Sequence, residues 1–255
     1  MISLRLLGCN GGIGGKDRQT TSYLLQESTI IDAGTGLTIL DLPELAAIDH
    51  VVLTHAHMDH IACLPLLIDS VTAQRESPVQ VWTLPEVIDI LSTHIFNEKV
   101  WPDFRKIPSP DSPFMTLNAI SQRTAIGGMF FTPLPARHGI PACGYLVENE
   151  GVALAFSGDT EDCPSFWEAM KQSSTLKAVV VECSYPSALT NIAQVSMHMD
   201  VPSIVARVAE LPKEITVVIV HRKPGLEDAI EAELRMQLPS RDLIFPKPGD
   251  VLSFG

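Results

Sequence analysis

An α/β fold with two β-sheets between outer layers of helices is predicted by three features of the 255-residue sequence. Short apolar strand candidates gather in two separate parts of the chain, and each group is followed by segments with helical periodicity. No low-complexity segment or short-period repeat interrupts this order. We therefore expect two β-rich halves whose sheets pack together, covered on the outside by helices.

The first half is expected to begin with a β-meander and to continue with alternating strands and helices. Apolar runs bounded by turn residues predict strands, whereas apolar residues spaced three and four apart predict helices. In chain order the predicted elements are a strand at Ile2–Leu7, a glycine-rich turn at Gly8–Gly15, strands at Thr20–Gln26 and Thr29–Asp32, a helical segment at Gly36–Ile48, a strand at Val51–Thr54, a helix at Met58–Val71, a strand at Val79–Thr83 and a helix at Pro85–Phe96. The proline-rich stretch Trp101–Pro113 is expected to be an irregular loop that could cover a cleft.

The second half repeats this organisation. Strands are predicted at Met129–Pro133, Gly144–Glu148 and Val152–Phe156, and helices and strands alternate again from Cys163 to the end. Alternating strands and helices are typical of sheets whose outer faces are covered by helices.

Composition narrows the classes of function. A length of 255 residues, 45% of them hydrophobic, predicts one globular domain spanning residues 1–255. The net charge of -12, with only 18 Lys and Arg, makes nucleic acid an unfavourable partner, because phosphate binding needs a basic face. Five scattered cysteines without CxxC spacing fit reduced thiols. With no basic leader and no apolar stretch near about 18 residues, we expect a cytoplasmic protein without a membrane partner.

The segment His55-Ala56-His57-Met58-Asp59-His60 carries the strongest chemical signal. Four side chains that bind metals lie within six residues, where a predicted strand passes into a predicted helix. In an extended segment His55 and His57 point to the same side, and the start of the helix turns Asp59 and His60 toward a second nearby point. A single histidine is usually a surface or core residue, but no packing or capping need calls for this combination. Imidazole and carboxylate together suit zinc, iron or manganese.

Two metals need further ligands, and three candidates follow apolar strands downstream. His138 follows the strand that includes Phe130–Leu134, Asp159 follows Val152–Phe156, and His221 follows Val217–Val220. Because each lies at a strand end, the three side chains could reach one shared site.

These motifs, together with Asp32, occur in the order found in the metallo-β-lactamase superfamily, which the sequence resembles over nearly its whole length. The resemblance implies a four-layer αβ/βα sandwich of the metallo-β-lactamase type and two divalent metal ions, with zinc expected and iron or manganese possible. It implies one metal at His55, His57 and His138, a second at Asp59, His60 and His221, a bridging Asp159, and Asp32 supporting the loop from behind. The β-lactamases themselves usually have Cys at the bridging position, so Asp159 argues against that activity.

Within the superfamily the sequence is most similar to class II cyclic-nucleotide phosphodiesterases. Met58 stands where that family has Leu in its HxH-Leu-Asp-His signature, and Cys63 departs from the expected Gly or Ser. Further similar segments are Asp32–Gly36, Phe96-Asn97, Trp101–Phe104 and His221–Pro224. The resemblance implies hydrolysis of a 3',5'-cyclic nucleotide, cAMP first, to the nucleoside 5'-monophosphate. Two metals can lower the pKa of a shared water toward ~7, so the expected nucleophile is a metal-bridging hydroxide.

Further residues are candidates for binding the substrate or for catalysis. For most of them a purely structural role is the alternative interpretation. Asp59, beside the metals, and His198 are the expected catalytic residues; His198 could protonate the leaving oxygen or hold the phosphate, or instead pack beside the helix that follows. Lys223 could contact phosphate or be a solvated surface lysine. Asn97 could bind the nucleobase or simply end a helix.

Competing hypotheses keep the fold and change the substrate. A tRNA 3'-processing endonuclease would use the same metals on a polymer, although that family usually has Gly where Met58 stands. A thioesterase or a lactonase would direct the same hydroxide at a carbonyl group. The fold could also serve as a catalytically silent binding module, but retention of all the metal ligands argues against it. The sequence does not decide between a monomer and a homodimer. The expected partner is a small-molecule cyclic nucleotide.

Overall fold

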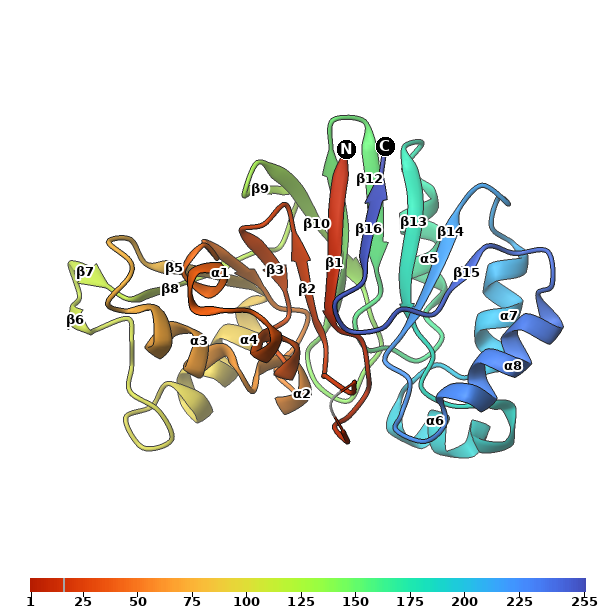
Figure 1. The fold of residues 1–255 in the computed structure, drawn as a ribbon, viewed down its shortest axis with the longest axis horizontal. Coiled ribbons are helices and arrows are strands. Elements are labelled where there is room, and N and C mark those ends of the chain that lie inside the picture. The colour runs from red at the N-terminus through yellow and green to blue at the C-terminus, as the bar shows by residue number, and fades with distance from the viewer. Residues whose placement is uncertain (16) are drawn as a thin grey trace.

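Two seven-stranded sheets packed face to face form the centre of the molecule. The structure is a computed structural model that describes residues 1–15 and 17–255. Figure 1 shows the sheets side by side with helices on both flanks. In spatial order the first sheet contains β16 (Val251–Phe254), β1 (Ile2–Gly8), β2 (Ser22–Leu25), β3 (Thr29–Ile31), β4 (His50–Val52), β5 (Val79–Thr83) and β8 (Met115–Ala119). The second contains β15 (Leu243–Ile244), β14 (Thr216–Val220), β13 (Leu176–Glu182), β12 (Val152–Phe156), β11 (Cys143–Asn149), β10 (Met129–Pro135) and β9 (Thr124–Ile126).

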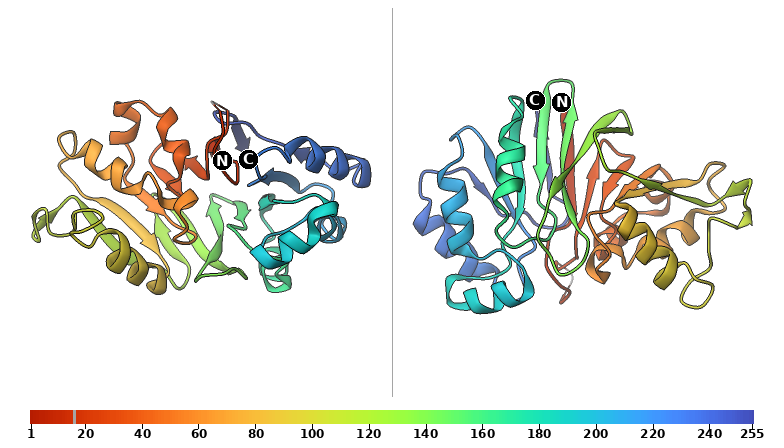
Figure 2. Two further views of the ribbon diagram at one scale, coloured as in Figure 1. Left: turned by 90° about the horizontal axis from the view of Figure 1, so that it is seen from below. Right: turned by 180° about the vertical axis from the view of Figure 1, so that it is seen from behind.

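The helices cover the outer face of each sheet (Figure 2). On the first sheet lie η1 (Thr35–Ile39), α1 (Leu42–Ala46), α2 (Met58–Ile61), α3 (Leu64–Val71), α4 (Pro85–Ile90) and η2 (Leu91–Ile95). The second half contributes α5 (Pro164–Lys171), η3 (Ser187–Leu189), α6 (Thr190–Ser196), α7 (Val201–Ala209) and α8 (Glu227–Gln237). Three buried apolar clusters fill the spaces between helices and first sheet, between the sheets, and between second sheet and helices. In the central space the rings of Tyr23 and Phe156 stack at 5.9 Å. Three such spaces define four layers, which confirms the predicted αβ/βα sandwich.

Each sheet combines an antiparallel part with a parallel part, and this arrangement sets the position of the candidate site. Strands β3, β4, β5 and β8 are parallel neighbours in the first sheet, as are β12, β13, β14 and β15 in the second. The carboxyl ends of parallel strands meet at one edge of a sheet, where ligand sites of α/β proteins usually lie. Both sheets therefore bring loop residues to the same side of the sandwich.

The predicted helix Met58–Val71 is wrong in one respect, because it is two helices. The break lies at Ala62–Cys63, where the Cys63 N–H leaves the helical pattern and donates to the Ala33 carbonyl at 2.9 Å. Pro65 lacks the N–H that a continuous helix would need at that position. The break lets α2 turn its polar side chains inward while α3 packs on the sheet.

Other predicted boundaries also shift. The helix predicted at Pro85–Phe96 ends as α4 at Ile90 and continues as a π-helical turn, in which the Phe96 N–H donates to the Leu91 carbonyl. The loop predicted at Trp101–Pro113 contains a small hairpin of β6 (Pro108–Ser109) and β7 (Ser112–Pro113), which Figure 1 places at the outer end of the first half, away from the strand ends. Edge strands β8 and β9 have no counterpart in the sequence prediction, since each contains a single buried residue, Met115 and Ile126, and shows no clear apolar alternation.

No helix within residues 1–15 and 17–255 is long and apolar enough to span a membrane.

Candidate metal centre

The candidate metal centre lies where strands of both sheets end. Asp32 follows β3, the His55–His60 segment follows β4, Asp159 follows β12 and His221 follows β14. His138 enters from the loop after β10. The topology thus collects all seven predicted ligands in one place, from segments far apart in the sequence.

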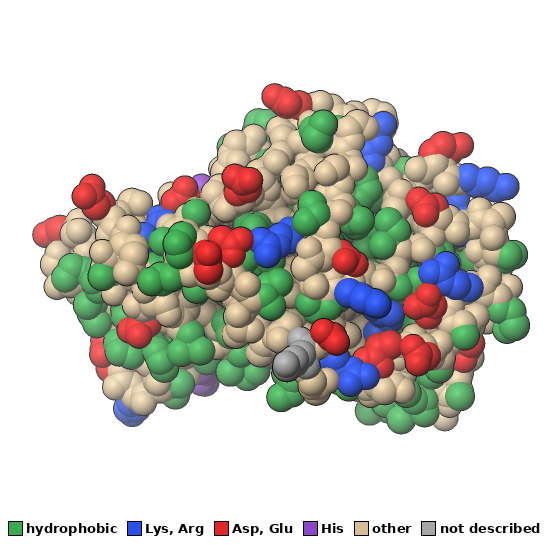
Figure 3. Space-filling view, in the orientation of Figure 1, with side chains coloured by type: hydrophobic (Ala, Val, Ile, Leu, Met, Phe, Trp, Pro, Cys, Tyr) green, Lys and Arg blue, Asp and Glu red, His purple; other side chains and the backbone are tan. Residues whose placement is uncertain are grey.

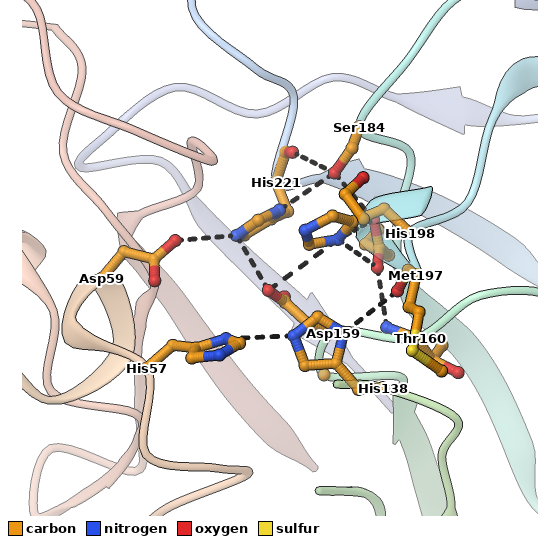
Figure 4. Close-up of polar contacts among 12 residues, drawn as sticks. His57, Asp59, His138, Asp159, Thr160, Ser184, Met197, His198 and His221 are labelled. Atoms are coloured by element: carbon orange, nitrogen blue, oxygen red, sulfur yellow. Dashed lines mark hydrogen bonds and ion pairs between the residues drawn. The ribbon is translucent and has the colours of Figure 1, made fainter. Parts of the chain in front are cut away.

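Three overlapping groups of residues could hold a metal ion, the third being Glu182, His198 and His221. Two of them, called the clusters below, are made of the predicted ligands, and the first contains His55, His57, His138 and Asp159. One ligand atom from each lies within 4.8 Å of the others. Nδ1 of His57 is 3.1 Å from Nε2 of His55. It is 3.0 Å from Nε2 of His138, a contact that Figure 4 shows. Two nitrogens held at ~2.0–2.1 Å by one tetrahedral ion lie roughly 3.3 Å apart, so this spacing fits a shared cation.

The second cluster contains Asp59, His60, Asp159 and His221, again within 4.8 Å. Nε2 of His60 is 3.4 Å from Nε2 of His221, which is 3.2 Å from Oδ2 of Asp59. Asp159 belongs to both clusters: Oδ1 lies 3.3 Å from His60 Nε2, and Oδ2 lies 3.2 Å from His221 Nε2 and 3.8 Å from His55 Nε2. This is the division of ligands that the resemblance implies.

The ring nitrogens that face away from the clusters bond to the surrounding protein. Nδ1 of His60 bonds to Oδ2 of Asp32 at 2.7 Å, which is the supporting position expected for Asp32. The same carboxylate accepts from the Thr54 hydroxyl, which lies 3.0 Å from His55 Nδ1. Such outer bonds fix the orientation and tautomer of metal-binding histidines.

The second sheet supplies equivalent outer partners. Nδ1 of His138 bonds to the Met197 carbonyl at 3.0 Å, and Nδ1 of His221 lies 3.1 Å from the Ser184 hydroxyl. The backbone of His221 is left-handed, with φ of 57°, and its N–H donates to the Cys9 carbonyl at 2.7 Å. The ring is therefore held in place from both the side chain and the main chain.

Burial and charge set the protonation of the cluster. Burial lowers the pKa of His55, His57 and His138, which keeps these imidazoles neutral near pH 7. Burial alone would raise the pKa of Asp159, but His221 and His60 hold it well below its usual range. At His60 burial would lower the pKa, but Asp159 and Asp32 outweigh burial and raise this pKa well above its usual value, so a metal bound there must displace a proton.

The residues fit two divalent metal ions. Five imidazole nitrogens and two carboxylates converge without a cation of their own, while nearly every outward ring nitrogen has a protein partner. The donor set contains no thiolate, so oxygen- and nitrogen-binding metals such as zinc, iron and manganese match it best.

His198 lies against both clusters. Its ring centre is 5.1 Å from that of His138 and 5.2 Å from that of His221. Its Nδ1 bonds to the Glu182 carboxylate at 2.9 Å. Burial lowers the pKa of His198, but the charge and hydrogen bond of Glu182 outweigh it, and the net direction is upward. His198 thus lies beside the clusters with Nδ1 bonded to a buried carboxylate.

Glu182, which sequence reasoning missed, organises this side of the site. It is buried at the end of β13 and also accepts from the Thr160 N–H at 2.7 Å and from the Ser184 hydroxyl at 2.8 Å. The only sequence signal is its position at the end of an apolar strand. Asp32 and Asp159 are similar in that each follows an apolar strand.

The two remaining substrate candidates occupy different positions. Lys223 is half-buried, and its charge reaches His198, where it acts to lower the pKa. The Asn97 amide is used locally: Oδ1 accepts from the N–H groups of Lys99 and Val100, and Nδ2 donates to the Thr93 carbonyl. Among the described residues the structure gives Asn97 no polar contact with the clusters, and its observed role is to hold a loop.

The fold and the clustered ligands define a metallohydrolase scaffold, and the family comparison agrees. Residues 29–221 match the family described as "Beta-lactamase superfamily domain", which covers most of the chain and every cluster residue. The protein belongs to this family.

Several relatives of known description are similar to the chain. It is 28% identical over 158 residues to 3',5'-cyclic-nucleotide phosphodiesterase 1 of Saccharomyces cerevisiae, covering 52% of this chain but only 43% of that protein. It is 23% identical to the probable 3',5'-cyclic-nucleotide phosphodiesterase of Yersinia pestis, covering 87% and 78% of the two chains, and 28% identical to ribonuclease Z of Mycobacterium marinum, covering 76% and 75%. The crystal structure of unliganded yeast PDE1 superposes with a TM-score of 0.79 at 20% identity, covering 95% of this chain and 96% of that one. The superposition shows that the chain shares the fold of that structure.

Proposed function

We propose that the protein is a dinuclear metal-dependent phosphodiesterase that hydrolyses a 3',5'-cyclic nucleotide, cAMP first, to the nucleoside 5'-monophosphate. The observation that carries the proposal is that Asp159 belongs to both ligand clusters, so that two cations would lie side by side. Likeness to two proteins named as cyclic-nucleotide phosphodiesterases supports the choice of substrate.

Each residue of the site has a defined part in this proposal. His55, His57 and His138 would hold one ion and Asp59, His60 and His221 the other, with Asp159 shared between the two groups; zinc is the expected metal, and iron or manganese would take its place if the site selects them. Two such ions supply positive charge for the phosphodiester and activate water near neutral pH. Asp59 is more exposed than Asp32 and Asp159, and therefore faces the arriving substrate.

His198 is the proposed general acid. Because Glu182 accepts from Nδ1, the imidazolium is stabilised and its opposite nitrogen is free to give a proton to the leaving 3' oxygen. Lys223, whose charge acts on His198, is the proposed contact for an outer phosphate oxygen.

The test is to incubate metal-reconstituted protein with cAMP, cyclic GMP, bis(p-nitrophenyl) phosphate and a precursor tRNA in separate reactions. Products are separated by chromatography, with a chelator control. We expect chelator-sensitive release of 5'-nucleotide from a cyclic substrate. Activity on the artificial diester alone would show that the natural substrate is a different phosphodiester.

An RNA-processing endonuclease is the second candidate, favoured by the likeness to ribonuclease Z over three quarters of the chain. Against it stands the net charge of -12, since binding a polyanion relies on many Lys and Arg contacts. On the face that Figure 3 shows, Lys and Arg side chains are interspersed with Asp and Glu and do not gather into one basic patch. Cleavage of the precursor tRNA, with no turnover of the cyclic nucleotides, would replace the first proposal with this one.

A further inference from the structure

A cavity of about 450 Å³ lies beside the metal centre, and none of the seven cluster residues lines it. Its wall is formed by the loop between β1 and β2, the loop after β14, the start of α8 and the segment after β15. Small-molecule sites usually have volumes of roughly 300–1,000 Å³. The cavity is therefore large enough for a small ligand, which would be held by residues other than the metal ligands.

The cavity wall includes a buried guanidinium group with unused donors. Arg222 directly follows the cluster residue His221 and is 6% exposed. Within residues 1–15 and 17–255 it has one hydrogen bond, in which Nη2 donates to the Pro246 carbonyl at 3.0 Å, while its buried Nε–H has no acceptor. The Glu231 carboxylate lies 3.9 Å from Nη1, too far for a hydrogen bond, and already accepts from Arg235 at 2.9 Å. Because arginine stays charged and buried charges are normally paired, this positive charge lacks a close partner.

Asn10 supplies a second unused donor to the same cavity. It is 4% exposed, and its backbone pairs with that of Arg222. In the described part of the chain its side chain has one contact, from the Cys9 thiol to Oδ1 at 3.9 Å, which leaves Nδ2 without an acceptor. The buried part of the wall thus presents amide and guanidinium N–H groups, whose complement is a group that only accepts hydrogen bonds.

The carboxylates of the cavity do not cancel this preference for an anion. Two of them are bonded to arginines and two are exposed: Glu227 to Arg18 at 2.6 Å, Glu231 to Arg235 at 2.9 Å, and Asp17 and Asp228. Water and salt screen exposed charges strongly and buried charges much less. Lys247, which also lines the cavity, is exposed and adds positive charge there. The buried part of the cavity is therefore governed by the charge of Arg222.

We propose that this cavity is a second binding site, which takes a small ligand through a carboxylate or phosphate group. Such oxyanions match the fork of N–H groups on an arginine, and Arg222 is the main contact. The Asn10 amide binds a further oxygen of the same group, and Lys247 adds positive charge at the exposed end. The site goes beyond the proposed function, because hydrolysis at the metal centre does not require it.

The test measures the binding of inorganic phosphate and of acetate to the metal-loaded protein by isothermal titration calorimetry. Phosphate can also bind at the metals, so the Asp159→Ala variant, which lacks the shared metal ligand, is titrated in parallel, and we expect one saturable site to remain in it. Arg222→Gln, introduced into the Asp159→Ala protein, should weaken that site by about 10- to 100-fold, the range for hydrogen bonds to a charged group. Arg222→Lys keeps the charge without the fork and should give an intermediate affinity.

Variants of less buried residues test the same site with opposite expected signs. Glu231→Gln removes the carboxylate nearest to Arg222 and should tighten anion binding by about 1.5- to 5-fold. Lys247→Ala should weaken it by a similar factor of about 1.5 to 5. Glu168→Gln, on α5 and outside the cavity, removes the same charge as Glu231→Gln and should leave the affinity unchanged.

The outcomes separate the two ligand chemistries and the failure of the proposal. Tighter binding of phosphate than of acetate assigns a phosphate group to the ligand, and the reverse assigns a carboxylate. If Asp159→Ala binds neither anion at a saturable site, or if Arg222→Gln leaves that binding unchanged, the proposal is wrong. If Arg222→Gln does not fold, Glu231→Gln and Lys247→Ala decide, and parental affinity in both overturns the proposal.

Discussion

Gly11 leaves no room for a side chain beside His221, and this predicts a substitution that should empty one metal position selectively. A Cβ atom added at Gly11 would lie 2.6 Å from the His221 carbonyl oxygen, 2.9 Å from Nδ1 and 3.0 Å from Cε1. Ordinary contacts of this kind begin near 3.4 Å. Gly11→Ala therefore requires His221, or the loop that carries Gly11, to move by about 0.5–0.8 Å.

His221 has little freedom to make room without losing its geometry. Its N–H, carbonyl and Nδ1 are held by Cys9 and Ser184 at 2.7–3.1 Å. Metal ligands tolerate deviations of only about 0.2 Å, and disturbing the support of a ligand typically costs about 10- to 100-fold in metal affinity. We expect a loss of that size at the Asp59–His60–His221 position, with little change at the other.

The assay is metal content by mass spectrometry after equilibration in metal-buffered solutions, together with hydrolysis rates. Gly139→Ala is the matched control, because it directly follows a ligand of the other position, His138, and an added Cβ there meets nothing within 4 Å. We expect Gly11→Ala to hold one tightly bound metal and to be nearly inactive, and the control to hold two. A Gly11→Ala protein with both metals bound at parental affinity and full activity would refute this reasoning.

The remaining predictions concern ligands, proton transfer, metal removal and pH. His57→Ala and Asp159→Ala should nearly abolish hydrolysis while circular dichroism still shows the folded protein; parental turnover in either would contradict the dinuclear proposal. His198→Ala and Glu182→Gln should each lower kcat by about 100-fold or more at unchanged metal content, and loss of metal instead would make the pair structural. Chelation should lower the Tm and addition of metal should restore it, because an ion that binds only the folded state stabilises it; an unchanged Tm would count against bound metal. A hydrogen bond from Arg105 holds the pKa of Asp103 at about 2, below its usual 3.8, so its stabilising effect is present above about pH 4 and is lost as the pH falls toward 2. The urea midpoint of the Arg105→Met variant should therefore lie below that of the parent protein at pH 6, and the two midpoints should converge near pH 2.

The fold could be predicted because its strands are short, apolar and bounded by clear turn residues. Val152–Phe156 and Val79–Thr83 are observed at the predicted bounds. The errors lie where tertiary contacts outweigh local pattern: the bond from Cys63 to Ala33 divides a continuous apolar pattern into α2 and α3. Likewise the edge strands β8 and β9 each bury only one residue fully, so no alternating pattern marks them in the sequence.

The site could be predicted in part for a related reason. His55, His57, Asp59 and His60 are nearly contiguous, so their spacing carries information, and the structure brings them together with His138, Asp159 and His221. Glu182 and the Met197 carbonyl act only through residues distant in sequence, so no local pattern marks them. Asn97 is a candidate for base binding by its residue type, but its amide is used by its own loop.

The acidity of the chain and an anionic substrate are compatible because charge acts locally at this site. Two divalent ions would bring four positive charges to a site that contains the carboxylates Asp59 and Asp159, with Asp32 and Glu182 behind the histidines, and this positive charge would be concentrated at the two metal positions. The net charge of -12 is spread over the whole chain, and at physiological salt exposed charges farther away than about 8 Å are largely screened. A single phosphate can thus be attracted to the metals while an extended polyanion meets a mostly acidic surface. The same distribution predicts that turnover of a small cyclic diester depends only weakly on salt, whereas a polymeric substrate would show the steep dependence that many phosphate contacts produce.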